Sequence, residues 1–242
     1  MLNGNQSFTT PIAQYEITSS AEEAVRFFEP RQLHDKQGTR ESPDTYFRYI
    51  NLEKGEEYSI GIKNTSGSRM LFCVGVDGRS VVNGARIPSL RDAASRKAWS
   101  DSNGYVISDE HLIRGWRESL DVERQFIVTD ALASYSAEVW DDSSAMGTIC
   151  IAVFREDTSY GSGMRGMRGG GDLGTGYAAR VASPVGTTVF NSKTCAYELL
   201  VLKYATAKTL KSLGIYVESP KTPEDSNRIW PAEQKFCKFP QG

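Results

Sequence analysis

Histidine is scarce in this chain of 242 residues, and neither sign of charge is in large excess. The two histidines, His34 and His111, are too few for the usual histidine-based metal and acid-base sites. Lys and Arg number 28 against 30 Asp and Glu, so no strong field draws the chain to nucleic acid or an anionic membrane. Serine-hydrolase, zincin and Walker motifs are also missing. The sequence therefore predicts no catalytic residues, no metal, no cofactor and no nucleic-acid partner.

Long apolar runs are absent as well. No stretch of about 18 apolar residues occurs, which is the length that a membrane-spanning helix needs. The first eight residues combine neither a basic start nor an apolar run of signal-peptide length. We expect an unprocessed protein, made in the cytoplasm, without a membrane partner.

The four cysteines show no short spacing of the kind that zinc knuckles and redox motifs require. Cys73, Cys150 and Cys195 lie in apolar runs, and we expect all three to be buried. Cys237 lies in a polar tail and is the candidate for exposure. Whether it forms a disulfide stays open.

Hydrophobic residues alternate with polar ones from Tyr46 onward, which is the pattern of strands with one buried face. The stretch 70–76 is almost entirely apolar, and Asp77-Gly78 after it indicates a tight hairpin. Further strands are expected at 58–62, 80–82, 105–107, 112–113, 125–129, 148–154 and 195–204. A polar, basic excursion over 87–103 is expected at the surface. These features predict a mainly β fold, a β-sandwich or jelly-roll-like core with one short C-terminal helix over 206–213 ended by Gly214.

Two polar segments flank that core. Residues 1–45 are expected to form an N-terminal arm that lies on its own domain or on a neighbour, with a short helix running from Ser19 or Ser20 to Phe28. Residues 46–214 make the core domain, and 215–242 a C-terminal arm. That second arm carries isolated aromatic residues as candidate interface anchors: Trp230, Phe236 and Phe239.

Glycine makes up eight of the sixteen residues from Gly161 to Gly176. Two G-x-G-x-x-G matches fall in this loop, but no strand runs into them and no helix follows, so a nucleotide site is not expected. Two arginines are few for an RNA-binding segment. If the loop is ordered, another subunit packs on it, because ordering costs about 1–2 kcal/mol per residue. The candidate contact residues are Arg165, Arg168, Gly169 and Gly170.

Several segments resemble a family of uncharacterised proteins from proteobacterial and tailed-phage genomes. They include the Val76-Asp77-Gly78 turn, Gly104–Ile107, Ile113–Ser119 and Gly174–Tyr177, and the resemblance covers about residues 58–213. It implies a phage or bacterial setting and carries over no catalytic residue. Within its most specific stretch, Trp116 is either a core residue or an interface hot spot with Arg117.

Together these features lead to one functional hypothesis. We expect a virion structural protein of a tailed phage, a capsid decoration or cement protein that forms homo-oligomers and binds capsid or other virion proteins. The alternative is a bacterial surface or ligand-binding β-sandwich. A carbohydrate-active enzyme would need two carboxylates about 5–10 Å apart across a cleft.

Overall fold

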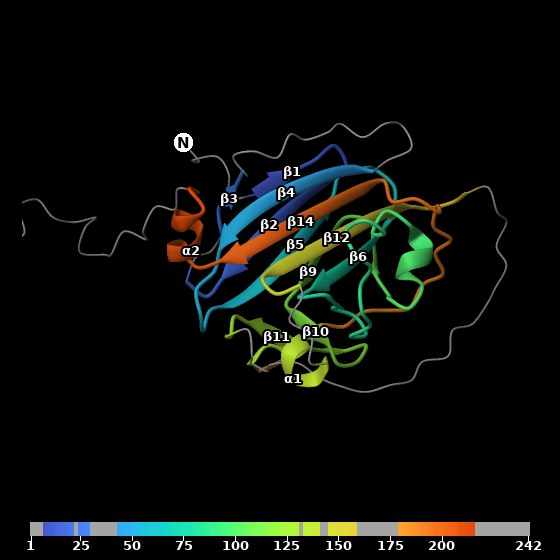
Figure 1. Ribbon diagram of the computed structural model, residues 1–242. Coiled ribbons are helices and arrows are strands. Elements are labelled where there is room, and N and C mark those ends of the chain that lie inside the picture. Colours follow the sequence, from blue (N-terminus) through green and yellow to red (C-terminus); the bar gives the residue numbers. More distant parts are fainter. Residues whose placement is uncertain are drawn as a thin grey trace, which may run out of the picture.

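The computed structural model describes residues 7–21, 24–29, 43–130, 133–140, 145–158 and 179–215. These residues form a mainly β fold in which two sheets pack face to face, as Figure 1 shows. The predicted fold class is therefore confirmed, including the short helix near the C-terminus. Within the described ranges, no helix is long and apolar enough to cross a membrane.

The first sheet runs in the order β1-β2-β5-β11-β10, with β9 beside β5 and β13 beside β11, and all its pairs are antiparallel. Its strands are β1 (Ser7–Thr9), β2 (Ala13–Ser19), β5 (Glu57–Asn64), β9 (Glu110–Ile113), β10 (Gly115–Arg117), β11 (Val122–Ile127) and β13 (Arg180–Ala182).

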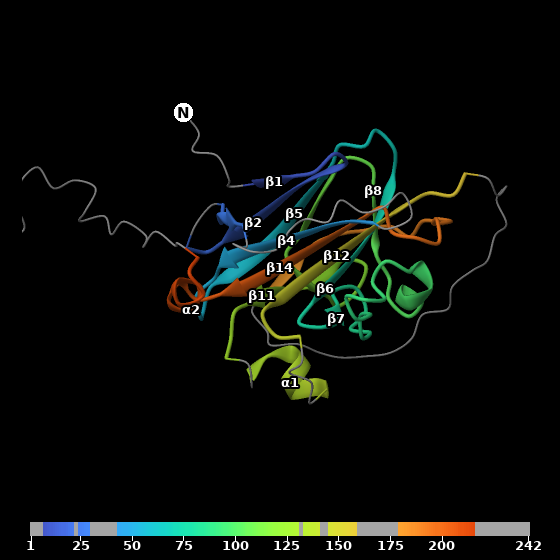
Figure 2. The same ribbon diagram turned by 45° about the horizontal axis from the view of Figure 1, so that its top comes forward.

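The second sheet runs in the order β3-β4-β14-β12-β6-β7, with β8 beside β6. Its strands are β3 (Phe27–Phe28), β4 (Asp44–Asn51), β6 (Met70–Val76), β7 (Arg79–Ser80), β8 (Tyr105–Ile107), β12 (Thr148–Arg155) and β14 (Glu198–Ala205). The pair β4–β14 is parallel and the others are antiparallel. The helices are η1 (Arg96–Trp99), α1 (Tyr135–Trp140) and α2 (Ala207–Ser212). Figure 2 shows α2 at the end of β14, whereas α1 lies away from that strand.

The main core lies between the two sheets. Strand β5 supplies Tyr58, Ile60 and Ile62 to it, as the alternation in the sequence predicts. The opposite sheet supplies side chains such as Phe72 and Ile151. Burial of this kind contributes about 25 cal/mol for each Å² of apolar surface removed from water, so the inter-sheet core is the main source of stability.

A second core covers the outer face of β6, β12 and β14. The segment expected as a surface excursion over 87–103 packs there, and that expectation is wrong in its central part. Trp99 of η1 is fully buried, and its indole N–H donates to the Ala93 carbonyl oxygen at 2.9 Å. The reason lies in the strands below, because their outer side chains, such as Phe154, are also apolar and need a cover.

The N-terminal segment is part of the sandwich in its described residues. Strand β2 pairs with β5 over seven residues, and Tyr15 and Ile17 are fully buried. The segment thus packs on its own core, as expected, but the boundary expected at residue 45 does not separate it from the sheet. The helix expected up to Phe28 is wrong in its described part, since Phe27 and Phe28 form β3 against β4. Phe27 is buried in the inter-sheet core and both residues pair with β4, so tertiary pairing outweighs the local helix signal.

Two of the cysteines expected to be buried are buried in the structure. Cys73 and Cys150 are buried, and burial raises the pKa of each thiol to about 12. Cys195 is exposed, contrary to expectation, because it precedes β14 and lies outside its apolar stretch. Cys237 lies outside the described residues.

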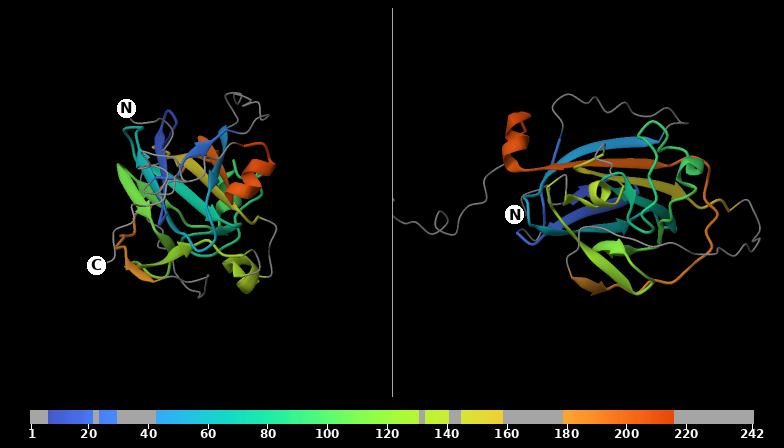
Figure 3. Two further views of the ribbon diagram at one scale, coloured as in Figure 1. Left: turned by 90° about the vertical axis from the view of Figure 1, so that its left-hand side faces the viewer. Right: turned by 60° about the horizontal axis from the view of Figure 1, so that its bottom comes forward.

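The hairpin turn and the C-terminal helix predicted from the sequence are both present, close to the predicted residues. Asp77 and Gly78 both have positive φ, 47° and 81°, as a type I′ hairpin turn between β6 and β7 requires. The backbone N–H of Thr209 donates to the hydroxyl oxygen of Thr206, which caps α2, and Gly214 follows its end with φ 76°. Figure 3 shows α2 directly after β14.

Candidate functional site

A cavity of about 440 Å³ lies at the end of the sandwich where β14 ends and β5 begins. Both sheets, the hairpin turn after β6 and helix α1 contribute to it. The lining residues are Leu52, Lys54, Tyr58, Val76, Asp77, Trp116, Phe126, Ile127, Val128, Thr129, Asp130, Ser134, Tyr135, Met146, Gly147, Tyr204, Ala205, Thr206 and Thr209. Its volume falls within the range of small-molecule sites.

Five aromatic residues that line this cavity form a row in which each ring contacts the next. Their centroids follow one another at 6.2 Å from Tyr204 to Tyr58, 5.0 Å to Phe126, 5.5 Å to Trp116 and 4.5 Å to Tyr135. They come from β14, β5, β11, β10 and α1, so both sheets and a helix fix the row. The rings of Tyr58 and Phe126 stack, whereas the other three contacts are tilted or edge-on, so the five rings form a packed aromatic cluster.

Asp77 is the buried acid of the cavity. The Tyr204 hydroxyl lies 2.8 and 2.9 Å from its two carboxylate oxygens and donates to them, and the backbone N–H of Thr148 donates at 3.3 Å. Burial raises the pKa of Asp77, although these hydrogen bonds and the charge of Lys203 oppose the shift. Burial, and the nearby charge of Asp77, also raise the pKa of Tyr58 well above its usual value. Hydrogen bonds from the Tyr204 hydroxyl and the Thr148 backbone therefore hold this acid in place, and Lys203 adds an opposite charge nearby.

The outer part of the cavity is more polar. Lys54 and Asp130 form an ion pair there, and both side chains are largely exposed. Asp77 and Asp130 thus place two carboxylates in one cavity. Exposed ion pairs contribute little to stability, so this pair leaves its two groups available to a ligand.

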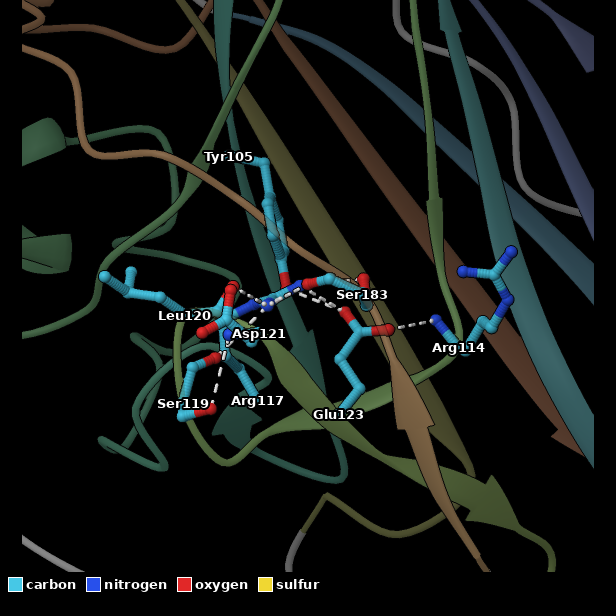
Figure 4. A network of polar contacts seen from close by, with 8 residues as sticks. All are labelled: Tyr105, Arg114, Arg117, Ser119, Leu120, Asp121, Glu123 and Ser183. Carbon is cyan, nitrogen blue, oxygen red and sulfur yellow. Dashed lines mark hydrogen bonds and ion pairs between the residues drawn. The ribbon is translucent and has the colours of Figure 1, made fainter.

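A second polar cluster is built around Arg117 of β10, as Figure 4 shows. Its guanidinium donates to Glu123 at 2.6 Å, to the Tyr105 hydroxyl at 3.0 Å and to the Ser183 carbonyl oxygen at 2.9 Å. The other Glu123 oxygen accepts from the backbone N–H of Arg114 at 3.1 Å. The side chains of Arg117 and Glu123 are 5% and 0% exposed. This network joins β8, β10, β11 and the segment after β13, and we interpret it as structural.

The structure places two of the residues singled out from the sequence in these clusters. Trp116 is a buried residue of the inter-sheet core that lines the cavity, and Arg117 is engaged within the chain. Both side chains are almost fully buried, so neither offers a contact surface to another chain. The other interface candidates, Arg165, Arg168, Gly169, Gly170, Trp230, Phe236 and Phe239, lie outside the described residues.

His111 does not form an acid-base cluster with its sequence neighbours. It lies in β9 with its ring 4.6 Å from that of Tyr105, and burial lowers its pKa, as do the charges of Arg117 and Arg114. Sequence reasoning missed the cavity itself. Its one local signal was the Asp77-Gly78 turn, which indicated a hairpin and said nothing of the rings around it.

No protein family model, curated protein or solved structure matches this chain. Among the described residues, no group of three or more His, Cys, Asp or Glu side chains is placed to hold a metal ion. The assignment of the cavity therefore depends on its own geometry.

Proposed function

We propose that this chain is a binding protein built on a β-sandwich, and that it serves as a structural component of a tailed-phage particle, as a decoration or cement protein. The observation that carries the binding role is the aromatic cavity. Ligand sites are typically cavities of this size, lined mainly by apolar and aromatic side chains with a few polar groups. The phage setting depends on the sequence resemblance alone.

The edge of the second sheet supports contacts with another chain. Strand β4 has eight residues, and among the described parts of the chain β3 pairs with two of them, Tyr49 and Ile50. Earlier in β4, the carbonyl oxygen of Phe47 accepts a hydrogen bond from the guanidinium of Arg48 at 2.8 Å. An extended segment of a neighbouring subunit could add to such an edge by strand pairing.

Mass spectrometry of purified phage particles from the encoding host tests this proposal. We expect the chain in a fixed ratio to the capsid protein. Hydrogen exchange of the free and particle-bound chain should then show protection of the edge around Thr45 and Phe47. Absence of the chain from particles would contradict the structural role.

The cavity also favours a second candidate, a bacterial surface or ligand-binding β-sandwich. Because the cavity contains two carboxylates, Asp77 and Asp130, a carbohydrate-active enzyme is a further candidate that can be tested. Release of reducing ends from oligosaccharides, lost in Asp77→Asn, would favour that enzyme over both binding roles.

A further inference from the structure

The outer edge of strand β4 in the second sheet is only partly paired among the described residues. The backbone N–H of Leu52, just after β4, donates to the carbonyl oxygen of Ala205 at the end of β14. Backbone groups alternate in direction along a strand, so the even-numbered residues of β4 point toward β14 and the odd-numbered ones point outward. Of these, Tyr49 pairs with β3. No strand among the described residues pairs with the outer side of Phe47 or Thr45.

The residue types at this edge favour pairing with a further strand. Continuing the β3 register by two residues would bring Pro30 opposite Phe47, and proline has no N–H to donate. The Phe47 carbonyl oxygen accepts from the guanidinium of Arg48, and its second lone pair can take another donor. Threonine, tyrosine and phenylalanine at 45–47 favour strands, and none is a lysine or proline of the kind that protects an open edge. The edge from Asp44 to Arg48 is therefore suited to strand addition.

This edge is complementary in charge to a second copy of itself. In an antiparallel pairing centred on Tyr46, Asp44 of each copy lies opposite Arg48 of the other. In the same register Thr45 lies opposite Phe47, so the outward-facing backbone groups of both copies form hydrogen-bonded pairs. Asp44 and Arg48 then occupy the non-hydrogen-bonded positions, where side chains approach most closely. Moving the centre by one residue in either direction removes both opposed charge pairs.

We propose that two copies of this chain form a two-fold symmetric dimer in which their β4 strands pair antiparallel about Tyr46. The second sheet then continues from one copy into the other. This proposal rests on the edge contact of the proposed function and names a second copy of the chain as the partner. It does not depend on the phage setting.

The side chain of Arg48 is already placed at this edge. Its guanidinium carbon lies 4.4 Å from the ring centroid of Phe8, and one of its nitrogens lies 3.3 Å from Glu29. The Glu29 side chain is 80% exposed, so this ion pair contributes little and can exchange for Asp44 of the second copy. Dimerisation removes water from the Asp44–Arg48 pairs, which strengthens the attraction between their charges.

Sedimentation equilibrium of the full chain tests the proposal through these two charges. Asp44→Arg and Arg48→Asp should each weaken dimerisation at least about tenfold, because like charges then face each other on both sides of the axis. When the two variants are mixed, opposite charges face each other again, so they should associate to within about threefold of the unmodified chain. Glu16→Arg, a matched control on an exposed position of β2, should change dimerisation by less than about threefold. Circular dichroism confirms that each variant is folded.

Three outcomes would overturn the dimer. They are a chain that stays monomeric over the accessible concentration range, a dimer that Asp44→Arg leaves unchanged, and single variants that do not associate when mixed. Presence of the chain in phage particles is measured separately, so this proposal and the proposed function can fail independently. The free chain in the hydrogen-exchange comparison is diluted until it is monomeric, so that protection in the particle still reports on the β4 edge.

Discussion

Two buried carboxylates in this molecule have different partners. Glu123 lies against a guanidinium at 2.6 Å, within a network that joins three strands. Asp77 lies at a cavity and accepts from the Tyr204 hydroxyl and the Thr148 backbone N–H, with the charge of Lys203 nearby. Removing the ionic partner of a fully buried carboxylate costs more than removing one neutral hydrogen-bond donor. The two carboxylates should therefore respond differently to the loss of a partner.

The largest effect is expected at Arg117. Arg117→Met leaves Glu123 buried without its ionic partner, which should lower the free energy of unfolding by about 3–5 kcal/mol. Urea unfolding followed by circular dichroism measures the change. The double variant Arg117→Met with Glu123→Gln should recover part of the loss, because no charge is then left alone.

A matched control uses an exposed arginine. Arg180 pairs with Glu118 at 2.7 Å, and its side chain is 66% exposed. Arg180→Met should leave the unfolding midpoint nearly unchanged, since water screens this pair. If both methionine variants behave alike, the Arg117 network is not the structural cluster described above.

A smaller effect is expected at Tyr204. Tyr204→Phe removes the hydroxyl that donates to Asp77, which should cost about 1–3 kcal/mol at neutral pH. The cost should shrink in acid, because protonated Asp77 needs the donor less. Unfolding curves at pH 7 and pH 4 measure the difference, and an equal cost at both values would show that Asp77 is not the group concerned.

The smallest effect concerns Glu198, which is buried and accepts from the Tyr15 hydroxyl at 2.6 Å. Burial raises its pKa, with Asp44 adding to the shift and the Tyr15 and Thr10 hydroxyls opposing it. A raised folded-state pKa means that the folded chain binds the proton more tightly, so stability falls as pH rises through the folded pKa. Glu198→Gln should flatten that slope in unfolding measurements between pH 4 and 8. An unchanged slope would assign it to other groups.

The features that could be predicted from the sequence are those that local patterns control. The alternation in β5, the apolar run of β6 and the Asp77-Gly78 turn all form as expected, because period and turn chemistry act within a few residues. The cover formed by Trp99 was missed, since charged and polar residues dominate its segment and only the outer faces of β6, β12 and β14 require it. The cavity was missed for the same reason. Its rings come from five separate elements, and no spacing in the sequence reports that they meet.

The pKa of Asp77, measured by carbon NMR in the unmodified chain and in Tyr204→Phe, tests the description of this carboxylate most directly. We expect a pKa above the ordinary aspartate value in the unmodified chain, because burial opposes ionisation. Tyr204→Phe should raise this pKa further, since the hydroxyl donates to the charged form of the acid. A pKa that is the same in both chains would contradict the role of Tyr204 as a donor to Asp77.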